Sequence, residues 1–97
     1  MAVMFMMEFS GIGRDTYDAV MKELGLDKKA AKWPKGVLSH AAGKSADGMC
    51  VVDVWESEAA FAKFKKTELL PAFQKVGAIP EPRVTVSKVC NRKTIKP

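Results

Sequence analysis

The segment 3–9 (VMFMMEF) most limits the fold, because it alternates like a strand and yet carries apolar side chains on both faces. Successive side chains of a strand point to opposite sides. One face therefore holds Val3, Phe5, Met7 and Phe9, and the other holds Met4, Met6 and Glu8. The segment 48–55 (GMCVVDVW) has the same character, interrupted by a single carboxylate, Asp53. Such strands are typical of a sheet that is covered on both sides.

The intervening segments predict helices and a hairpin. Tyr17, Val20, Met21 and Leu24 recur at helical spacing after Asp15, a candidate N-cap, and Gly25 is a natural helix end. The segments 36–43 and 48–55 flank the short linker KSAD, which predicts a β-hairpin.

A second helix follows the hairpin. Ser57 can cap it, Phe61 and Phe64 begin its buried face, and Gly77 ends it. Pro71 breaks or kinks this helix unless a new helix starts near Leu70. The segment 83–90 (RVTVSKVC) predicts the last strand. The order is βαββαβ, so we expect an α+β, ferredoxin-like fold with a four-stranded antiparallel sheet.

Size and composition predict one domain over residues 1–92, followed by a basic tail over 93–97. The sequence has no apolar run long enough to span a bilayer and no basic leader, so we expect a cytoplasmic protein with no membrane partner. Cys50 and Cys90 lack metal-ligand spacing, which predicts free thiols, with Cys50 in the core, and no metal site.

Two helices cover only one face of a four-stranded sheet. We assign Cys50, Val52 and Val54 to the helix side, and Met49, Val51, Asp53 and Trp55 to the uncovered side with Met4 and Met6. An exposed apolar face of this kind marks an interface or a ligand site. The expected partner is a second copy of the chain, packed sheet against sheet as a homodimeric barrel around an apolar pocket.

His40, the sole histidine, is the main catalytic candidate. If Gly43 pairs with Gly48, His40 lies on the same face as Asp53 and diagonal to it. His40 is then a general base that Asp53 orients. The alternatives are a structural histidine, and an Asp53 paired with Arg14, Arg83 or a lysine. The expected ligand-binding residues are Trp55, Met4, Met6, Val51 and Phe64.

The stretch VVDVWESEAAFAKF, followed by LLPAF and a final strand, resembles the dimeric α+β barrel superfamily. That group includes antibiotic biosynthesis monooxygenases, haem-degrading monooxygenases, plant polyketide cyclases and stress-responsive barrel proteins. GVLSHAAG and VVDVWES also resemble a poorly characterised bacterial branch of it. The resemblance implies the barrel fold and dimerisation.

The resemblance also bears on chemistry. Haem-degrading members carry an Asn on the first strand, and a Trp and an iron-binding His on the second helix. Here Met6 and Met7, Phe64 and Gln74 stand in those regions, so no haem or other cofactor is implied. Quinone-forming members use no cofactor, and Trp55 echoes part of their pocket. Plant cyclases use a His and a Tyr; His40 is available, and the only tyrosine, Tyr17, lies on a predicted helix facing the sheet.

Three functions follow as hypotheses. The first is a cofactor-independent monooxygenase acting on a small aromatic or polyketide-like molecule. The second is a non-catalytic small-molecule-binding or stress-responsive barrel, and the third a polyketide cyclase or isomerase. The βαββαβ order and the net charge of +5 also fit an RNA-recognition motif. However, Met49 and Val51 stand where its stacking aromatic rings belong, which argues against nucleic acid as a partner.

Overall fold

A computed structural model describes residues 1–96, so Pro97, the last residue of the expected tail, lies outside the described residues. The elements run β1 (Val3–Ser10), α1 (Arg14–Leu24), β2 (Val37–Lys44), β3 (Gly48–Trp55), α2 (Glu58–Phe64), η1 (Lys65–Leu69), α3 (Leu70–Val76) and β4 (Arg83–Lys88). The predicted βαββαβ order is confirmed. Within residues 1–96, no helix has the length and apolar character needed to cross a membrane.

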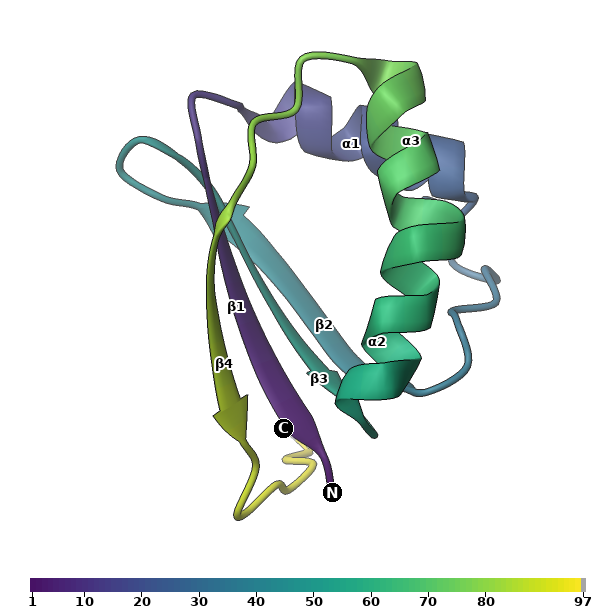
Figure 1. Cartoon of the computed structure of the whole chain (residues 1–97), viewed down its shortest axis with the longest axis vertical. Coiled ribbons are helices and arrows are strands. Elements are labelled where there is room, and N and C mark those ends of the chain that lie inside the picture. Colours follow the sequence, from purple (N-terminus) through teal and green to yellow (C-terminus); the bar gives the residue numbers. More distant parts are fainter. Residues whose placement is uncertain (97) are drawn as a thin grey trace.

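The strands form one antiparallel sheet in the order β2-β3-β1-β4, with the helices on one side of it (Figure 1). The two doubly apolar strands, β1 and β3, are therefore the central pair. Their register places Phe5 opposite Asp53 and Val3 opposite Trp55. This arrangement is the expected ferredoxin-like α+β fold.

Local signals explain most of the helix ends. Ser57 caps α2, since its Oγ accepts a hydrogen bond of 3.1 Å from the Ala60 amide. Gly25 ends α1 in the left-handed conformation, at φ 74°. The prediction of Asp15 as the N-cap was wrong, because α1 starts after Gly13 and Asp15 lies within its first turn. A carboxylate in that turn still favours the helix through the helix dipole.

Pro71 does not break the second helical segment. Instead, α2 and α3 are joined by η1, a π-helical turn in which the Leu70 amide bonds to the Lys65 carbonyl five residues earlier. Proline lacks an amide hydrogen and clashes with the carbonyl four residues before it. One wider turn before Pro71 relieves this conflict, so a new helix starts at Leu70, one of the two predicted outcomes.

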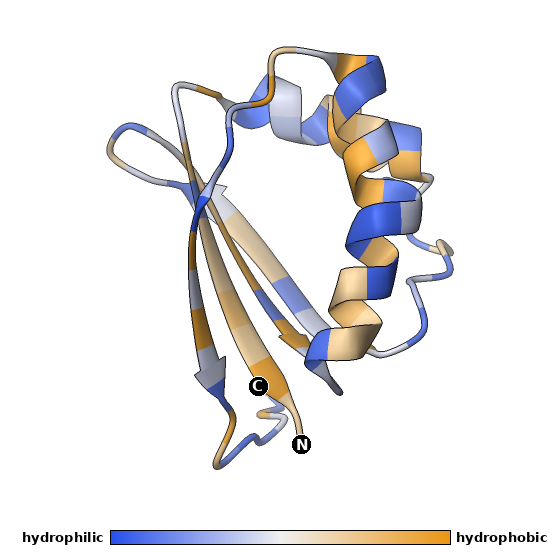
Figure 2. Cartoon of the chain, in the orientation of Figure 1, coloured by the Kyte–Doolittle hydropathy of each residue, from blue (hydrophilic) through white to orange (hydrophobic). Residues whose placement is uncertain are grey.

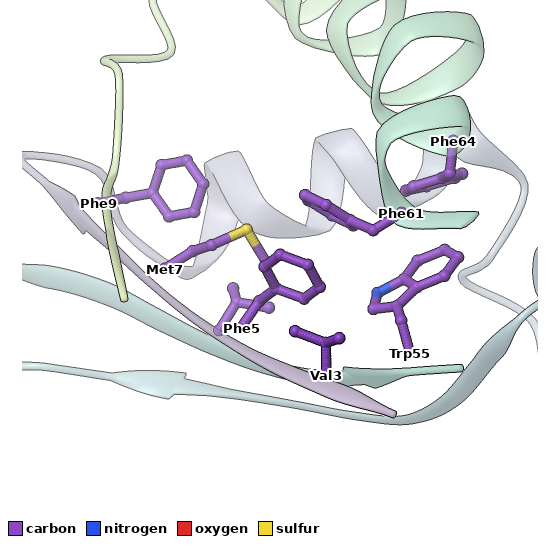
Figure 3. Close-up of a cluster of buried hydrophobic side chains, with 8 residues drawn as sticks. Val3, Phe5, Met7, Phe9, Trp55, Phe61 and Phe64 are labelled. Carbon is purple, nitrogen blue, oxygen red and sulfur yellow. The ribbon is translucent and has the colours of Figure 1, made fainter. Parts of the chain in front are cut away.

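An aromatic core lies between the sheet and the helices (Figure 3). The rings of Phe5 and Phe61 are 4.3 Å apart, and those of Trp55 and Phe64 are 5.4 Å apart. Pairs at these separations contribute about 1 kcal/mol each beyond the apolar area they bury. The core thus fixes α2 over the central strands.

The predicted faces of β3 were wrong. Met49, Val51, Asp53 and Trp55 point to the helix side and are buried, whereas Cys50, Val52 and Val54 are half-buried on the open face. The assignment of Met4 and Met6 to the open face is confirmed, at 40% and 41% exposure. We attribute this orientation to side-chain size, because the large rings on β1 and β3 fill the space between the sheet and the helices. Figure 2 shows that β1 is hydrophobic along most of its length, and Met4 and Met6 are its apolar residues on the open face.

Candidate functional site

A cavity lies between the helix side of the sheet and the helices, with a volume of about 70 Å³. That is room for a few water-sized groups. The walls come from every layer of the fold and are almost entirely apolar. Their polar members are Tyr17 from α1, His40 from β2 and Asp53 from β3, together with the indole rings of Trp33 and Trp55.

Four of these side chains form one hydrogen-bonded chain. Tyr17 Oη lies 2.6 Å from His40 Nε2, and His40 Nδ1 lies 2.6 Å from Asp53 Oδ1. Trp55 Nε1 donates to the other carboxylate oxygen, Asp53 Oδ2, at 3.2 Å. Both oxygens of the carboxylate therefore have a hydrogen-bond partner. The pair is buried, since Asp53 is 6% exposed and Trp55 is 1% exposed. This satisfies the requirement that a buried charge be hydrogen-bonded.

The chain of bonds indicates which nitrogen of a neutral histidine carries the hydrogen. An ionised carboxylate only accepts hydrogen bonds, so the contact between Asp53 and His40 requires a hydrogen on Nδ1. In the neutral imidazole Nε2 then carries no hydrogen, and it accepts the hydroxyl hydrogen of Tyr17. The site therefore has the layout of a catalytic triad, with a tyrosine hydroxyl at the end where a serine hydroxyl often lies.

Tyr17 is half-buried at the edge of the cavity. Burial raises the pKa of its hydroxyl above 10.0, and the negative charges of Asp53 and Asp18 raise that pKa further, against a smaller opposing effect of Arg14. Arg14 is ion-paired to Asp18 at 3.1 Å on the exposed side of α1. Tyr17 therefore keeps its proton at neutral pH.

Trp33 covers the histidine from the outside. Its ring lies 4.9 Å from the ring of His40, and the residue is 41% exposed although it is large and apolar. A surface groove between α1 and the segment that follows it shares four residues with the cavity: Tyr17, Met21, Leu26 and Trp33. These four residues belong to the wall that the cavity and the groove share.

The structure brings together five of the seven residues predicted for the site. His40, Asp53, Trp55, Val51 and Phe64 all line the cavity. Met4 and Met6 are on the opposite face of the sheet, which excludes them from it. The predicted register was also wrong, because Gly43 pairs with Cys50 and His40 lies directly opposite Asp53. This shift by two residues keeps His40 and Asp53 on one face.

Sequence reasoning missed Tyr17 and Trp33 as site residues. Tyr17 was expected on a helix that faces the sheet, which is correct, but Asp53 was placed on the other face and the two could not meet. Trp33 lies in a linker and has no periodic signal. Among residues 1–96, no group of three or more His, Cys, Asp or Glu side chains is placed to hold a metal ion.

Comparisons with known proteins support the fold. No protein-family model matches the sequence, and no curated protein matches it significantly. Solved structures do match. A candidate antibiotic biosynthesis monooxygenase from Chloroflexus aurantiacus has a TM-score of 0.72 at 15% identity, covering 99% of this chain and 100% of that one. The chain shares its fold.

Two further structures with this fold come from streptomycetes. SnoaB, a cofactor-independent oxygenase from Streptomyces nogalater, has a TM-score of 0.64 at 13% identity, over 94% of this chain and 95% of its own. A monooxygenase from Streptomyces coelicolor, solved with the ligand nanaomycin D, has a TM-score of 0.55 at 23% identity, over 99% and 91%.

Proposed function

We propose that this chain is a cofactor-independent monooxygenase of the antibiotic biosynthesis type, acting on a small aromatic or polyketide-like molecule. The observation that carries the proposal is the hydrogen-bonded chain of Tyr17, His40 and Asp53 at the wall of an otherwise apolar cavity. A base held in place by a carboxylate is suited to removing a proton from a carbon acid. An apolar cavity suits the aromatic body of such a substrate.

The chemistry requires only a base, molecular oxygen and a dry site. The hydrogen-bonded chain of Tyr17, His40 and Asp53 takes a proton from an activated CH₂ group, with His40 as the final acceptor. The resulting carbanion adds to oxygen to form a peroxide anion. The peroxide receives the proton back. Removal of the second C–H proton then breaks the O–O bond, which leaves a ketone and water. One oxygen atom enters the product and the other leaves as water, so the substrate is oxidised by two electron pairs and oxygen is reduced to the same extent.

The cavity must enlarge to hold such a substrate. Binding sites for drug-sized molecules have volumes of roughly 300–1,000 Å³, well above the volume here. Trp33 belongs to the wall, is partly exposed and lies in a linker rather than in a helix or strand. Displacement of its ring is the simplest way to open the cavity toward the groove.

Anthrone is a suitable first substrate, because its CH₂ group is acidified by two aromatic rings. Its oxidation to anthraquinone consumes one O₂ molecule and releases one water molecule, as in the steps above. The assay follows oxygen uptake and incorporation of one labelled oxygen atom. His40→Ala is expected to lose on the order of 10²–10⁴-fold in turnover. Lys44→Ala, an exposed change on the same strand, is the matched control and should keep full turnover.

The alternative is a binding protein without chemistry. It is favoured if anthrone or a related ligand binds in the cavity and no oxygen is consumed. Equal oxygen uptake by the wild type and His40→Ala would exclude the histidine as the base while leaving an oxygenase possible. A cyclase or isomerase would use the same base, and it is distinguished by turnover that does not need oxygen.

We also propose a homodimer formed through the open face of the sheet. The centre of that face carries the half-exposed Met4 and Met6 beside the half-buried Val52 and Val54, an apolar patch that water solvates poorly. A second copy presents the same surface, and two-fold symmetry closes the contact. Because the cavity lies on the other side of the sheet, dimerisation would stabilise the chain without completing the site.

A further inference from the structure

The geometry points to Tyr17, and not to His40, as the group that contacts the ligand, and to a hydroxyl-bearing aromatic molecule as the ligand that it selects. This inference rests on the proposed function only in its use of the same cavity. It concerns which atom meets the ligand and what that atom can bind.

His40 has no nitrogen free for a ligand. Its Nδ1 lies 2.6 Å from Asp53 and its Nε2 lies 2.6 Å from Tyr17. The ring of Trp33 covers it at 4.9 Å, and only 17% of its side chain is exposed. A ligand can reach Nε2 only by displacing Tyr17, which would break a short hydrogen bond.

Tyr17 is placed where a ligand would arrive. It lines both the cavity and the outer groove, so its side chain belongs to the walls of both. With a neutral His40, the single hydroxyl hydrogen of Tyr17 is used in the bond to Nε2. The oxygen then offers only lone pairs to the cavity. The remaining walls are apolar apart from two indole rings and the internally bonded His40 and Asp53.

An acceptor in an apolar cavity selects a ligand with a donor. A phenol or an enol supplies one, whereas the corresponding ether or ketone does not. A net hydrogen bond contributes about 1 kcal/mol, which corresponds to a preference of roughly 5-fold to 10-fold for the hydroxyl compound over its methyl ether. Anthrone meets this requirement as its enol tautomer.

Proton transfer follows from the same bonds. The ligand hydroxyl gives its proton to Tyr17 Oη while Tyr17 gives its own proton to His40 Nε2. One O–H bond breaks at the ligand and one N–H bond forms at the histidine, and the imidazolium is held beside the Asp53 carboxylate. For an enol, this produces the same delocalised anion as removal of the C–H proton. In the reverse step, Nε2 donates to Tyr17, whose hydrogen now points to the ligand.

The test compares the binding of 2-naphthol with that of 2-methoxynaphthalene. Binding is followed through the indole N–H signals of Trp33 and Trp55, assigned with a Trp33→Phe variant, so that only ligand in the cavity is counted. We expect the wild type to prefer 2-naphthol by roughly 5-fold to 10-fold. Tyr17→Phe, which keeps the ring, should bind both compounds alike and near the affinity of the ether.

Three results would overturn the inference: equal affinity in the wild type, a hydroxyl preference that survives in Tyr17→Phe, or binding of neither compound. Because Tyr17→Phe could perturb packing, the binding of 2-methoxynaphthalene is its internal control and should be unchanged. Failure here and failure of the proposed function are separable. If the protein prefers 2-naphthol but consumes no oxygen with anthrone, only the oxygenase proposal is rejected. If it consumes oxygen but shows no such preference, only the ligand-binding role of Tyr17 is rejected.

Discussion

Replacing Asp53 by asparagine tests directly which groups donate and which accept hydrogen bonds at the site. The carboxylate accepts from His40 Nδ1 through one oxygen and from Trp55 Nε1 through the other. An amide of the same shape has one acceptor and one donor end. If its oxygen faces His40, its NH₂ group meets the Trp55 N–H. If its oxygen faces Trp55, its NH₂ group forces His40 to carry its hydrogen on Nε2 instead.

The expected cost follows from these two orientations. The first leaves the buried Trp55 donor unpaired, which costs about 1–3 kcal/mol. Either orientation also exchanges a charge-assisted bond to His40 for a neutral one, which costs about 1 kcal/mol more. Relief from burying a charge offsets part of this, because Asp53 is only 6% exposed. A net loss of about 2 kcal/mol would lower the melting temperature of a domain of this size by roughly 8–16 °C.

The assay combines thermal unfolding with the nitrogen NMR signals of the imidazole, which are unambiguous because the chain has one histidine. The wild type should show a hydrogen on Nδ1 of His40, and Asp53→Asn should show a shift toward Nε2. Glu81→Gln makes the same chemical change at an exposed position and should alter neither. A wild-type histidine protonated on Nε2 alone would refute the assigned chain of bonds.

Three further outcomes follow from the fold. Because burial and Asp53 raise the pKa of Tyr17 above 10.0, the folded state holds this proton more tightly than the unfolded chain. The wild type should therefore lose stability relative to Tyr17→Phe as the pH rises past about 10, measured by urea unfolding. Met6→Lys on the open face should convert the proposed dimer into a monomer in sedimentation velocity. Gly48→Ala would place a Cβ 1.8 Å from the Phe9 carbonyl oxygen and should cost about 3 kcal/mol in thermal unfolding, whereas Gly43→Ala, with open space around it, should cost far less.

The order of elements was predictable because each was specified locally. The alternation in β1, the Ser57 cap and Gly25 each act within a few residues, and the structure has all three as expected. The π-helical turn was not predictable, because it arises from a conflict between Pro71 and the need to keep one continuous buried face. The sequence shows the conflict but not how the backbone resolves it.

Five of the seven predicted residues line the cavity, but the face of the sheet on which it lies was not predictable. Both faces of β3 are apolar, so alternation alone could not decide which one meets the helices. Asp53 was placed on the outer face because the other face, with Cys50, Val52 and Val54, carries no charge, and carboxylates tend to avoid a core. That tendency is overcome here because His40 and Trp55 supply a hydrogen-bond donor for each carboxylate oxygen. Cross-strand register brings His40 to Asp53, and side-chain packing brings the Trp55 indole to it. Neither can be read from one sequence.

The change of face alters what dimerisation can do for function. A pocket between two sheets would exist only in the dimer, so activity would depend on protein concentration. A cavity between one sheet and its own helices is complete in a single chain, as are Tyr17, His40 and Asp53. A Met6→Lys monomer that stays folded should therefore keep its hydroxyl preference for 2-naphthol. Loss of that preference in a folded monomer would mean that the partner contributes to the site after all.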